Sequence, residues 1–345
     1  MQGSARDAGF RIPAEWTRHQ AVWLGWPHLG EEWKEGLAAP RRAFAALCAA
    51  IAGQPGSERL EILVPDAAGE AEARAALGAT PARYHSFDYG DVWLRDTGPI
   101  FLVGGPGGHQ LAAAAFRFNG WGGKFLMRQD AAVAARVAAI AEVRRFDPGW
   151  VLEGGAIDVD GEGTLLTTRQ CLLGDNRNPG LSQRDLEARL CADLGVEHVL
   201  WLDRGLNNDH TDGHVDTLAR FVAPGVVACM EPADDDPNRD ALDAIRRDLA
   251  AMRDARGRRL EVMTVPSPGA VYAGDRELLA ASYLNFYIAN TRVVVSTYGV
   301  APDDAAVAAM GRLFDRPTIG VPAKAILVGG GAFHCMTQQQ PEVAP

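Results

Sequence analysis

The segment of residues 163–203 contains the pattern that decides the fold. It begins with the β-branched run GTLLTT (163–168), continues through the helix-like stretch LSQRDLEARLCADL (181–194) and ends in the apolar run HVLWLD (198–203). Short runs rich in β-branched residues favour strands, and an Ala-, Leu-, Arg- and Glu-rich stretch of this length favours a helix. We interpret the segment as a strand, a helix and a returning strand.

The predicted helix has recognisable signals at both ends. Ser182, followed three residues later by Asp185, resembles a capping box, and Gly195 is the residue type that most readily ends a helix. Pro40 marks the first turn of another helix in the same way, because proline is tolerated where a helix begins.

Similar units recur along the chain. Helix-like stretches begin near residues 40, 130, 181, 237 and 302, and apolar strand-like runs lie between them. The alternation predicts an α/β protein, and about five units of two strands, a helix and a returning strand predict a repeat architecture closed on itself. Because no linker or low-complexity segment divides the chain, we predict a single domain over residues 1–345.

Composition restricts the possible functions. The chain has 345 residues, is 47% hydrophobic and carries a formal net charge of −10, which argues against a nucleic-acid or anionic-membrane partner. Five cysteines without a C-x-x-C pair indicate reduced thiols. Residues 1–15 have no apolar core typical of a signal peptide, and no apolar run is long enough to span a bilayer. We therefore expect a cytoplasmic protein.

Cys335 differs from the other cysteines in its surroundings. It follows the apolar run AILV (325–328), which we interpret as a strand, and a triple glycine that would let the backbone approach a ligand. A polar run, 337–340, comes after it. Cys335 is either a buried thiol or a nucleophile. The remaining thiols are predicted to be buried and inert: Cys48, Cys171, Cys191 and Cys229.

A nucleophilic cysteine needs a nearby base or positive charge. In the segment HTDGHVD, alternation along a strand would place His214, Asp216 and Asp212 on one face, and this acidic setting would raise the pKa of His214. A structural histidine is one alternative. Another is a metal site made of His210, Asp212, His214 and Asp216, although four ligands spread along one strand are difficult for one ion to collect.

Three carboxylates suggest a guanidinium ligand. Asp96 in W-L-R-D-T-G-P, Glu153 in E-G-G and Asp216 provide fixed acceptors of the kind that a planar guanidinium with five donors requires. Trp93 offers a flat face for a cation or an alkyl chain. The alternatives are an ion pair of Asp96 with Arg95, and simple core packing of Trp93. We expect the Gly-rich run FNGWGGK to form a loop over the pocket, with its lysine in solvent.

These motifs together resemble the agmatine deiminase family, which is grouped with bacterial-type peptidylarginine deiminases. The matching segments occur in family order from about residue 13 to residue 341. They are PAEWTRHQAVWLGWP, DVWLRDTGPIF, FNGWGGK, LEGGAIDVDGEGTLLTTRQCLL, NRNPGLS, TDGHVDTLARF, ASYLNFYIAN and GGGAFHCMTQQQP. The resemblance implies the five-bladed α/β propeller called the pentein fold, which agrees with the fivefold periodicity.

The resemblance also implies catalytic roles. Cys335 in G-G-G-x-x-H-C corresponds to the nucleophile that forms an amidino-cysteine adduct. His214 in T-D-G-H-V-D corresponds to the general acid and base, and Glu153 to the acid that contacts this histidine and a guanidinium nitrogen.

Substrate-binding roles follow from the same matches. Asp96 and Asp216 correspond to the carboxylates that hold the guanidinium, and Trp93 to an aromatic wall of the substrate channel. Three residues in the catalytic motifs depart from the family's usual pattern: Ala156, Ala332 and Phe333. We expect them to alter the pocket near the nucleophile.

The predicted reaction is hydrolysis of agmatine to N-carbamoylputrescine and ammonia, a step of putrescine biosynthesis, with no metal and no organic cofactor. The predicted partner is a small cationic guanidine, and a homodimer is a possible assembly. Two alternatives stay open: a deiminase of arginine or peptidyl-arginine, and a non-catalytic protein that binds guanidines or polyamines.

Overall fold

The computed structural model describes residues 3–33, 36–274 and 276–343, so the ends of the predicted domain, 1–345, lie outside the described residues. Five of the sheets in this part of the chain share one strand pattern. Two strands pair antiparallel, and a helix then leads to a third strand that is parallel to the second. The α/β class and the repeated ββαβ unit are therefore confirmed.

Four units are continuous in sequence. The first unit consists of β5 (Ile100–Gly104), β6 (Gln110–Ala114), α5 (Asp130–Ile140) and β7 (Arg144–Phe146), and the second of β8 (Asp158–Val159), β9 (Thr164–Thr168), α7 (Gln183–Leu194) and β10 (His198–Leu202). The third consists of β11 (Ala219–Ala223), β12 (Val226–Glu231), α8 (Arg239–Ala251) and β13 (Glu261–Pro266). The fourth consists of β16 (Tyr287–Ile288), β17 (Val293–Thr297), α9 (Asp303–Met310) and β18 (Thr318–Pro322).

The fifth unit joins the two ends of the chain. It is built from β19 (Gln338–Pro341), β2 (His19–Gly25), α1 (Ala38–Ala52) and β3 (Arg59–Val64), and it is extended by α2 (Ala67–Leu77) and β4 (Ala82–Ser86). The antiparallel pairing of β19 with β2 is supported by a buried hydrogen bond of 2.8 Å from Trp23 Nε1 to Gln340 Oε1. This pairing closes the arrangement of sheets. The short strand β1 (Phe10–Arg11) is added beside β5.

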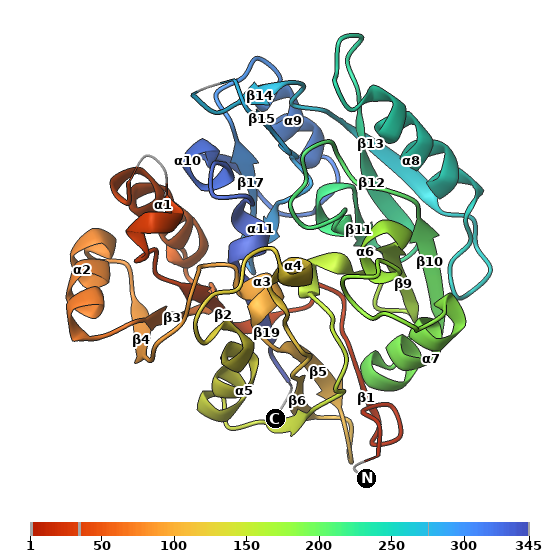
Figure 1. Cartoon of the computed structure of the whole chain (residues 1–345), viewed down its shortest axis with the longest axis horizontal. Coiled ribbons are helices and arrows are strands. Elements are labelled where there is room, and N and C mark those ends of the chain that lie inside the picture. The colour runs from red at the N-terminus through yellow and green to blue at the C-terminus, as the bar shows by residue number, and fades with distance from the viewer. Residues whose placement is uncertain (1–2, 34–35, 275, 344–345) are drawn as a thin grey trace.

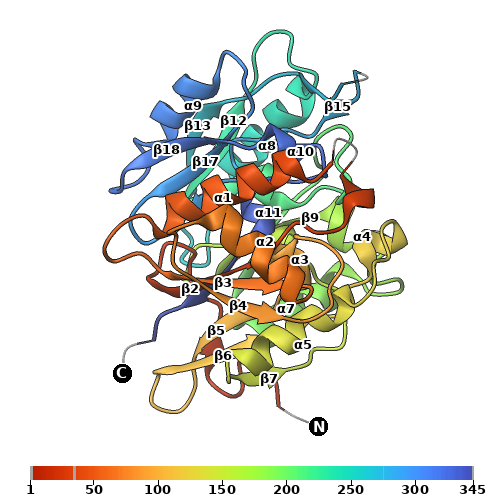
Figure 2. The same ribbon diagram turned by 90° about the vertical axis from the view of Figure 1, so that its left-hand side faces the viewer.

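The helices of these units lie on the outside, and a set of short turns lies at the centre. Figure 1 shows α1, α2, α5, α7 and α8 around the periphery, and in Figure 2 α1 and α2 face the viewer. The short central elements are α3 (Leu94–Thr97), η2 (Gly154–Ala156), η3 (Val215–Thr217) and α11 (Phe333–Met336). Helix α3 contacts both α11 and η2, and η2 contacts η3, so four segments far apart in sequence meet there.

The remaining elements are short. They are η1 (Gly30–Glu32), α4 (Gly120–Gly123), α6 (Arg169–Leu172), β14 (Val271–Tyr272), β15 (Leu278–Leu279) and α10 (Lys324–Leu327). None of the helices in the described ranges is long and apolar enough to cross a membrane.

The predicted helix ends agree with the structure. Helix α7 begins after Ser182, whose side chain and that of Asp185 form the expected capping box, and Gly195 ends it with a left-handed φ of 69°. The other main helices of the repeat begin at 38, 130, 239 and 303, within two residues of the predicted starts. Capping signals therefore located the repeating unit correctly.

The predicted strand before Cys335 is wrong. The run AILV lies in or beside α10, a single helical turn whose Ile326 and Leu327 are buried against the interior. A short apolar run has the same pattern in a buried strand and in a buried helical turn, so periodicity alone does not distinguish them. Here the turn packs against α1 instead of extending a sheet.

Candidate active site

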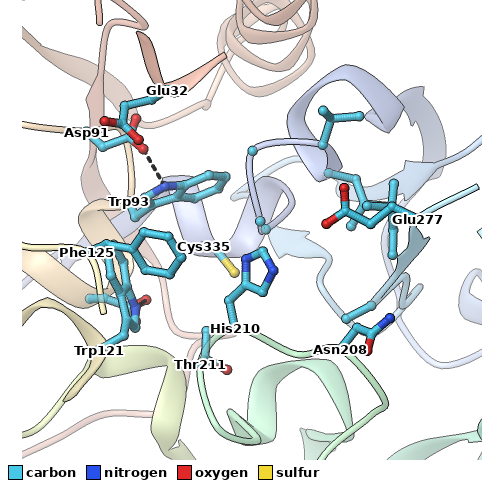
Figure 3. Close-up of a pocket in the computed structure, with 18 of the residues that line it drawn as sticks. Glu32, Asp91, Trp93, Trp121, Phe125, Asn208, His210, Thr211, Glu277 and Cys335 are labelled. Atoms are coloured by element: carbon cyan, nitrogen blue, oxygen red, sulfur yellow. Dashed lines mark hydrogen bonds between the residues drawn. The ribbon is translucent and has the colours of Figure 1, made fainter. Parts of the chain in front are cut away.

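A pocket of about 220 Å³ lies over the central turns. Trp93, Asp96 and Cys335 are among the residues that line it. Figure 3 shows the sulfur of Cys335 facing the space between the ring of Trp93 and His210. The other three predicted site residues, His214, Glu153 and Asp216, are fully buried beside this end of the pocket.

Cys335 lies in the turn α11 with only 5% of its surface exposed. Its Sγ is 3.0 Å from Asn285 Nδ2 and 3.5 Å from Asp216 Oδ2. Burial raises the pKa of the thiol well above its usual value, and the negative charges of Asp216 and Asp96 raise it further. The sulfur is therefore a neutral thiol in the free protein, and a cation beside it would favour the thiolate.

Asn285 is a site residue that the motif analysis did not single out. Its Oδ1 accepts the backbone N–H groups of His334 at 3.0 Å and of Cys335 at 3.3 Å, so its Nδ2 must face Sγ and Asp216. The amide is thus held as a donor to the sulfur. Its sequence signal is the segment ASYLNFYIAN (281–290), which contributed only as a match to the family.

Asp96 and Asp216 are held by different partners. Asp96 accepts the backbone N–H of Gly155 and Trp121 Nε1, each at 2.9 Å. Asp216 accepts His334 Nδ1 at 2.8 Å through Oδ2, whereas its buried Oδ1 has no hydrogen-bond partner among the described residues. Both carboxylates are fixed in position, and Asp216 Oδ1 is left to accept an N–H from a ligand.

Glu153 precedes η2 and is paired with Arg177. Its Oε1 accepts Arg177 Nε at 2.6 Å, and its Oε2 has no partner among the described residues. Arg177 also donates to Asp212 Oδ2 at 3.0 Å and to the carbonyl of Thr211 at 2.9 Å. This arginine therefore ties Glu153 to the loop that leads to His214.

His214 does not lie on a strand, so the predicted alternation with Asp212 and Asp216 is wrong. It directly precedes η3, after a tight loop in which Asp212 and Gly213 have φ of 65° and 88°. The carboxylate of Asp209 stabilises this loop by accepting the backbone N–H of Gly213 at 3.0 Å. Local side-chain hydrogen bonds of this kind compete with a strand.

The surroundings of His214 are acidic, as the sequence predicts. Its Nδ1 is 3.7 Å from Asp96 Oδ1. A ring nitrogen of His214, the sulfur of Cys171 and a carboxylate oxygen of Glu153 lie within 4.8 Å of one another. Burial lowers the pKa of His214, but the charge of Asp96 and the other neighbours outweigh burial, and the pKa lies well above its usual value. At neutral pH the ring is therefore a proton donor.

Trp93 forms a rigid wall. Its Nε1 donates to Asp91 Oδ2 at 2.7 Å, and its ring packs against that of Trp33 with centroids 6.2 Å apart. Burial raises the pKa of Asp91 to about 7. A Cβ at Gly331 would lie 2.7 Å from the Trp93 ring and 3.1 Å from Cys335 Cβ, which explains why a glycine stands there.

The Gly-rich run FNGWGGK forms an unusual left-handed turn. Residues 120–123 have consecutive φ of 70°, 51°, 79° and 82°, and three of the four are glycines. Trp121 is the exception. Its hydrogen bond to Asp96 accompanies this backbone conformation, which L-residues rarely adopt. The turn therefore presents Trp121 to the carboxylate.

The four ligands of the alternative metal site do not converge in the described part of the chain. Asp212 accepts Lys124 Nζ at 2.5 Å, and His210 lines the pocket, whereas His214 and Asp216 face the central turns. Lys124 is exposed, as expected, and it also donates to the carbonyl of His210 at 2.8 Å. This ion pair joins the Gly-rich turn to the loop before His214.

The other cysteines and the unusual alanines are mostly interior. The buried thiols are Cys48, Cys171 and Cys229, whereas Cys191 is half-buried. The positions that depart from the family pattern are also buried and are not among the residues that line the pocket: Ala156, Ala332 and Phe333. An effect of these three on a ligand would have to be indirect.

Gly155 is the point where three functional groups meet. A Cβ at this position would lie 2.6 Å from His214 Nδ1, 2.9 Å from Asp96 Oδ1 and 3.1 Å from Asp216 Oδ2. A side chain as small as a methyl group would therefore displace one or more of these three side chains.

We expect Gly155→Ala to lower the hydrolysis of guanidine substrates by about 100-fold, because a displacement of about 1 Å has this effect on a catalytic constellation. Steady-state kinetics would measure the loss. The control is Gly311→Ala, where φ is −61° and a Cβ would meet nothing closer than 3.4 Å. Equal activity of both variants would show that the close contact at Gly155 is unimportant.

Comparisons with known proteins identify the family. The model of the Porphyromonas-type peptidyl-arginine deiminases matches residues 11–341. An agmatine deiminase of Pseudomonas aeruginosa is 40% identical over 97% of this chain and 96% of its own length. The solved agmatine deiminase of Enterococcus faecalis superposes with a TM-score of 0.92 at 34% identity, over 99% of this chain and 98% of that one. A cysteine-to-serine variant of the C. jejuni agmatine deiminase, solved with substrate bound, superposes with a TM-score of 0.87 at 26% identity, over 97% of each chain. The chain belongs to the Porphyromonas-type peptidyl-arginine deiminase family.

Proposed function

We propose that this protein is an agmatine deiminase, a hydrolase of the C–N bonds of linear amidines, with Cys335 as its nucleophile. One observation carries the proposal. The sulfur lies beside two anchored carboxylates, Asp96 and Asp216, and further carboxylates line the rest of the pocket. This distribution of charge suits a molecule with a guanidinium at one end and a second cation at the other.

The guanidinium is the end that reaches the sulfur. A planar cation with several N–H donors is bound best by acceptors in fixed positions, and Asp216 Oδ1 and Glu153 Oε2 are buried acceptors with no partner in the described residues. Its charge also offsets the repulsion by Asp96 and Asp216 that keeps Cys335 protonated. Substrate binding thus helps to generate the thiolate.

In the first half of the reaction, Cys335 loses its thiol proton to solvent as the cation binds, and the thiolate attacks the central carbon of the guanidinium. A tetrahedral adduct forms, and protonated His214 transfers its proton to the departing nitrogen. Ammonia leaves, and the amidino group remains bound to sulfur as a thiouronium. Asn285 Nδ2 donates to the sulfur, and Trp93 limits the movement of the substrate.

In the second half, neutral His214 takes a proton from water, and the resulting hydroxide attacks the same carbon. The C–S bond breaks, the proton on the new carbonyl oxygen passes to the sulfur and restores the thiol, and the neutral ureido product leaves. Glu153 and Asp96 stabilise the imidazolium that forms again. The net reaction consumes one water and releases ammonia, with no redox step.

The other end of the substrate lies among acidic residues. Glu31, Glu32, Asp91 and Glu277 line the pocket. Figure 3 shows Glu32 and Asp91 on one side of the pocket and Glu277 on the other. Agmatine carries an ammonium at this end, whereas free arginine carries a carboxylate as well, which these acidic residues repel. The charge of the pocket therefore favours agmatine over arginine.

Two other functions are the alternatives. The first is deimination of peptidyl-arginine, the activity named in the description of the family model. The second is the binding of guanidines without turnover. A role in putrescine biosynthesis, a cytoplasmic location, a single domain and a homodimer stay predictions.

We expect agmatine to be hydrolysed with a higher kcat/KM than arginine or an arginyl peptide, and Cys335→Ala to remove detectable turnover of all three. A colorimetric assay for ureido products would measure both effects. The control Cys191→Ala changes a half-buried thiol in the outer helix α7 and should keep full activity. Full activity of Cys335→Ala would refute the nucleophile, and preference for the peptide would support the first alternative.

The charge of Asp216 gives a prediction with a definite sign. In Asp216→Asn, one carbonyl oxygen can keep the contacts of Oδ2, while the negative charge that raises the pKa of Cys335 is removed. We expect the pH profile of Cys335 alkylation by iodoacetamide to move to lower pH, although turnover falls by about 100-fold because the clamp is lost. A profile that stays in place or moves to higher pH would contradict this account.

A further inference from the structure

A group of buried charges lies beneath the pocket. Glu15 is its centre: its carboxylate accepts Arg95 Nη1 at 3.0 Å, Arg220 Nη2 at 2.5 Å and His334 Nε2 at 3.0 Å. Arg220 also pairs with Asp158. The cations hold the pKa of Glu15 well below its usual value, although burial acts in the opposite direction. Arg95 therefore pairs with Glu15 and not with its neighbour Asp96.

His334 connects this group to the site. The ring is fully buried, with Nδ1 2.8 Å from Asp216 Oδ2 and Nε2 3.0 Å from both oxygens of Glu15. Each ring nitrogen therefore lies within hydrogen-bond distance of a carboxylate. The side chain thus forms a bridge between Glu15 and Asp216.

The backbone of His334 is held as firmly as its ring. Its N–H donates to Asn285 Oδ1 at 3.0 Å, and its carbonyl accepts Arg95 Nε at 3.4 Å. It is also the residue before Cys335 in α11, so the same turn carries the bridge and the nucleophile. A shift of His334 would therefore move the clamp relative to the sulfur.

We propose that His334 is a positioning residue that orients the Asp216 carboxylate for the substrate guanidinium by tying it to the buried Glu15 group. Asp216 Oδ2 is occupied by His334 Nδ1 and Asn285 Nδ2, so Oδ1 is the oxygen available to the ligand. The second carboxylate of the clamp, Asp96, is held by a backbone N–H and a tryptophan instead. This inference rests on the proposed deiminase function.

If His334 positions Asp216, its loss should weaken substrate binding in addition to any loss of protein stability. Without the donor at Nδ1, Asp216 Oδ2 retains only Asn285 Nδ2 and the weak thiol donor of Cys335, so the carboxylate can rotate away from the guanidinium and KM rises. A purely structural role for His334 would lower the fraction of folded enzyme, and thus the apparent kcat, at constant KM. The change in KM therefore separates positioning from structural support.

Two amide variants separate the halves of the bridge. In His334→Asn the side-chain amide can take the place of Nδ1 and donate to Asp216, whereas in His334→Gln it can take the place of Nε2 and donate to Glu15. We expect His334→Gln to raise the KM for agmatine by about 10- to 100-fold, the effect of losing one hydrogen bond to a charged group, and His334→Asn to recover most of this loss. Circular dichroism and thermal unfolding would report the folded fraction of each variant.

The matched control is His85→Gln, which breaks another histidine–carboxylate contact of 2.7 Å, to Glu61 on the peripheral strands β3 and β4. It should leave KM and kcat unchanged. Equal KM values for the wild type and both His334 variants, or a larger KM for His334→Asn than for His334→Gln, would overturn the proposal. If the wild type hydrolyses no guanidine, the deiminase function itself fails, and this outcome is separate from unequal kinetics among active variants.

Discussion

The arrangement at the centre of this protein depends on keeping buried charges paired. Four charged side chains and one imidazole ring come from segments that are far apart in sequence, and each is almost fully removed from water: Glu15, Arg95, Arg220, Asp158 and the ring of His334. A buried charge without a partner costs several kcal/mol, so these side chains are stable only when all of them meet. The pairing therefore fixes α3, β8, β11 and α11 relative to one another, and the catalytic turns are part of or adjacent to those elements.

The same principle explains why the site is poised for a cation. Asp96 and Asp216 lie near a sulfur whose pKa they raise, and two buried acceptors of the site, Asp216 Oδ1 and Glu153 Oε2, are without partners in the described residues. A guanidinium supplies the positive charge and the N–H donors together. Catalysis then begins when the substrate arrives, because the substrate's own charge favours the thiolate.

Local signals in the sequence were sufficient for the repeating unit and for selecting side chains that the fold brings together at the central turns. Capping residues located the helices, and the rare combination of a thiol, an imidazole and carboxylates in glycine-rich motifs indicated a guanidinium site. The short segments AILV and TDGHVD were misassigned, because a few residues of apolar or alternating pattern fit a strand as well as a turn. The turns that formed are stabilised by local hydrogen bonds and by packing against other segments.

The roles of four residues were not predictable from local pattern: Asn285, Arg177, Glu15 and His334. Glu15 and His334 are 319 residues apart, and their contact requires the two ends of the chain to meet, as they also do in the pairing of β19 with β2.

The central claim is that Cys335 becomes covalently attached to the amidino group of the substrate. The most direct measurement is mass spectrometry of protein that has been mixed with agmatine and quenched in acid, followed by peptide mapping. The account predicts an increase equal to the mass of agmatine less ammonia on the peptide that contains Cys335. Turnover of agmatine with unmodified Cys335 at every quench time, or with the adduct on another residue, would contradict it.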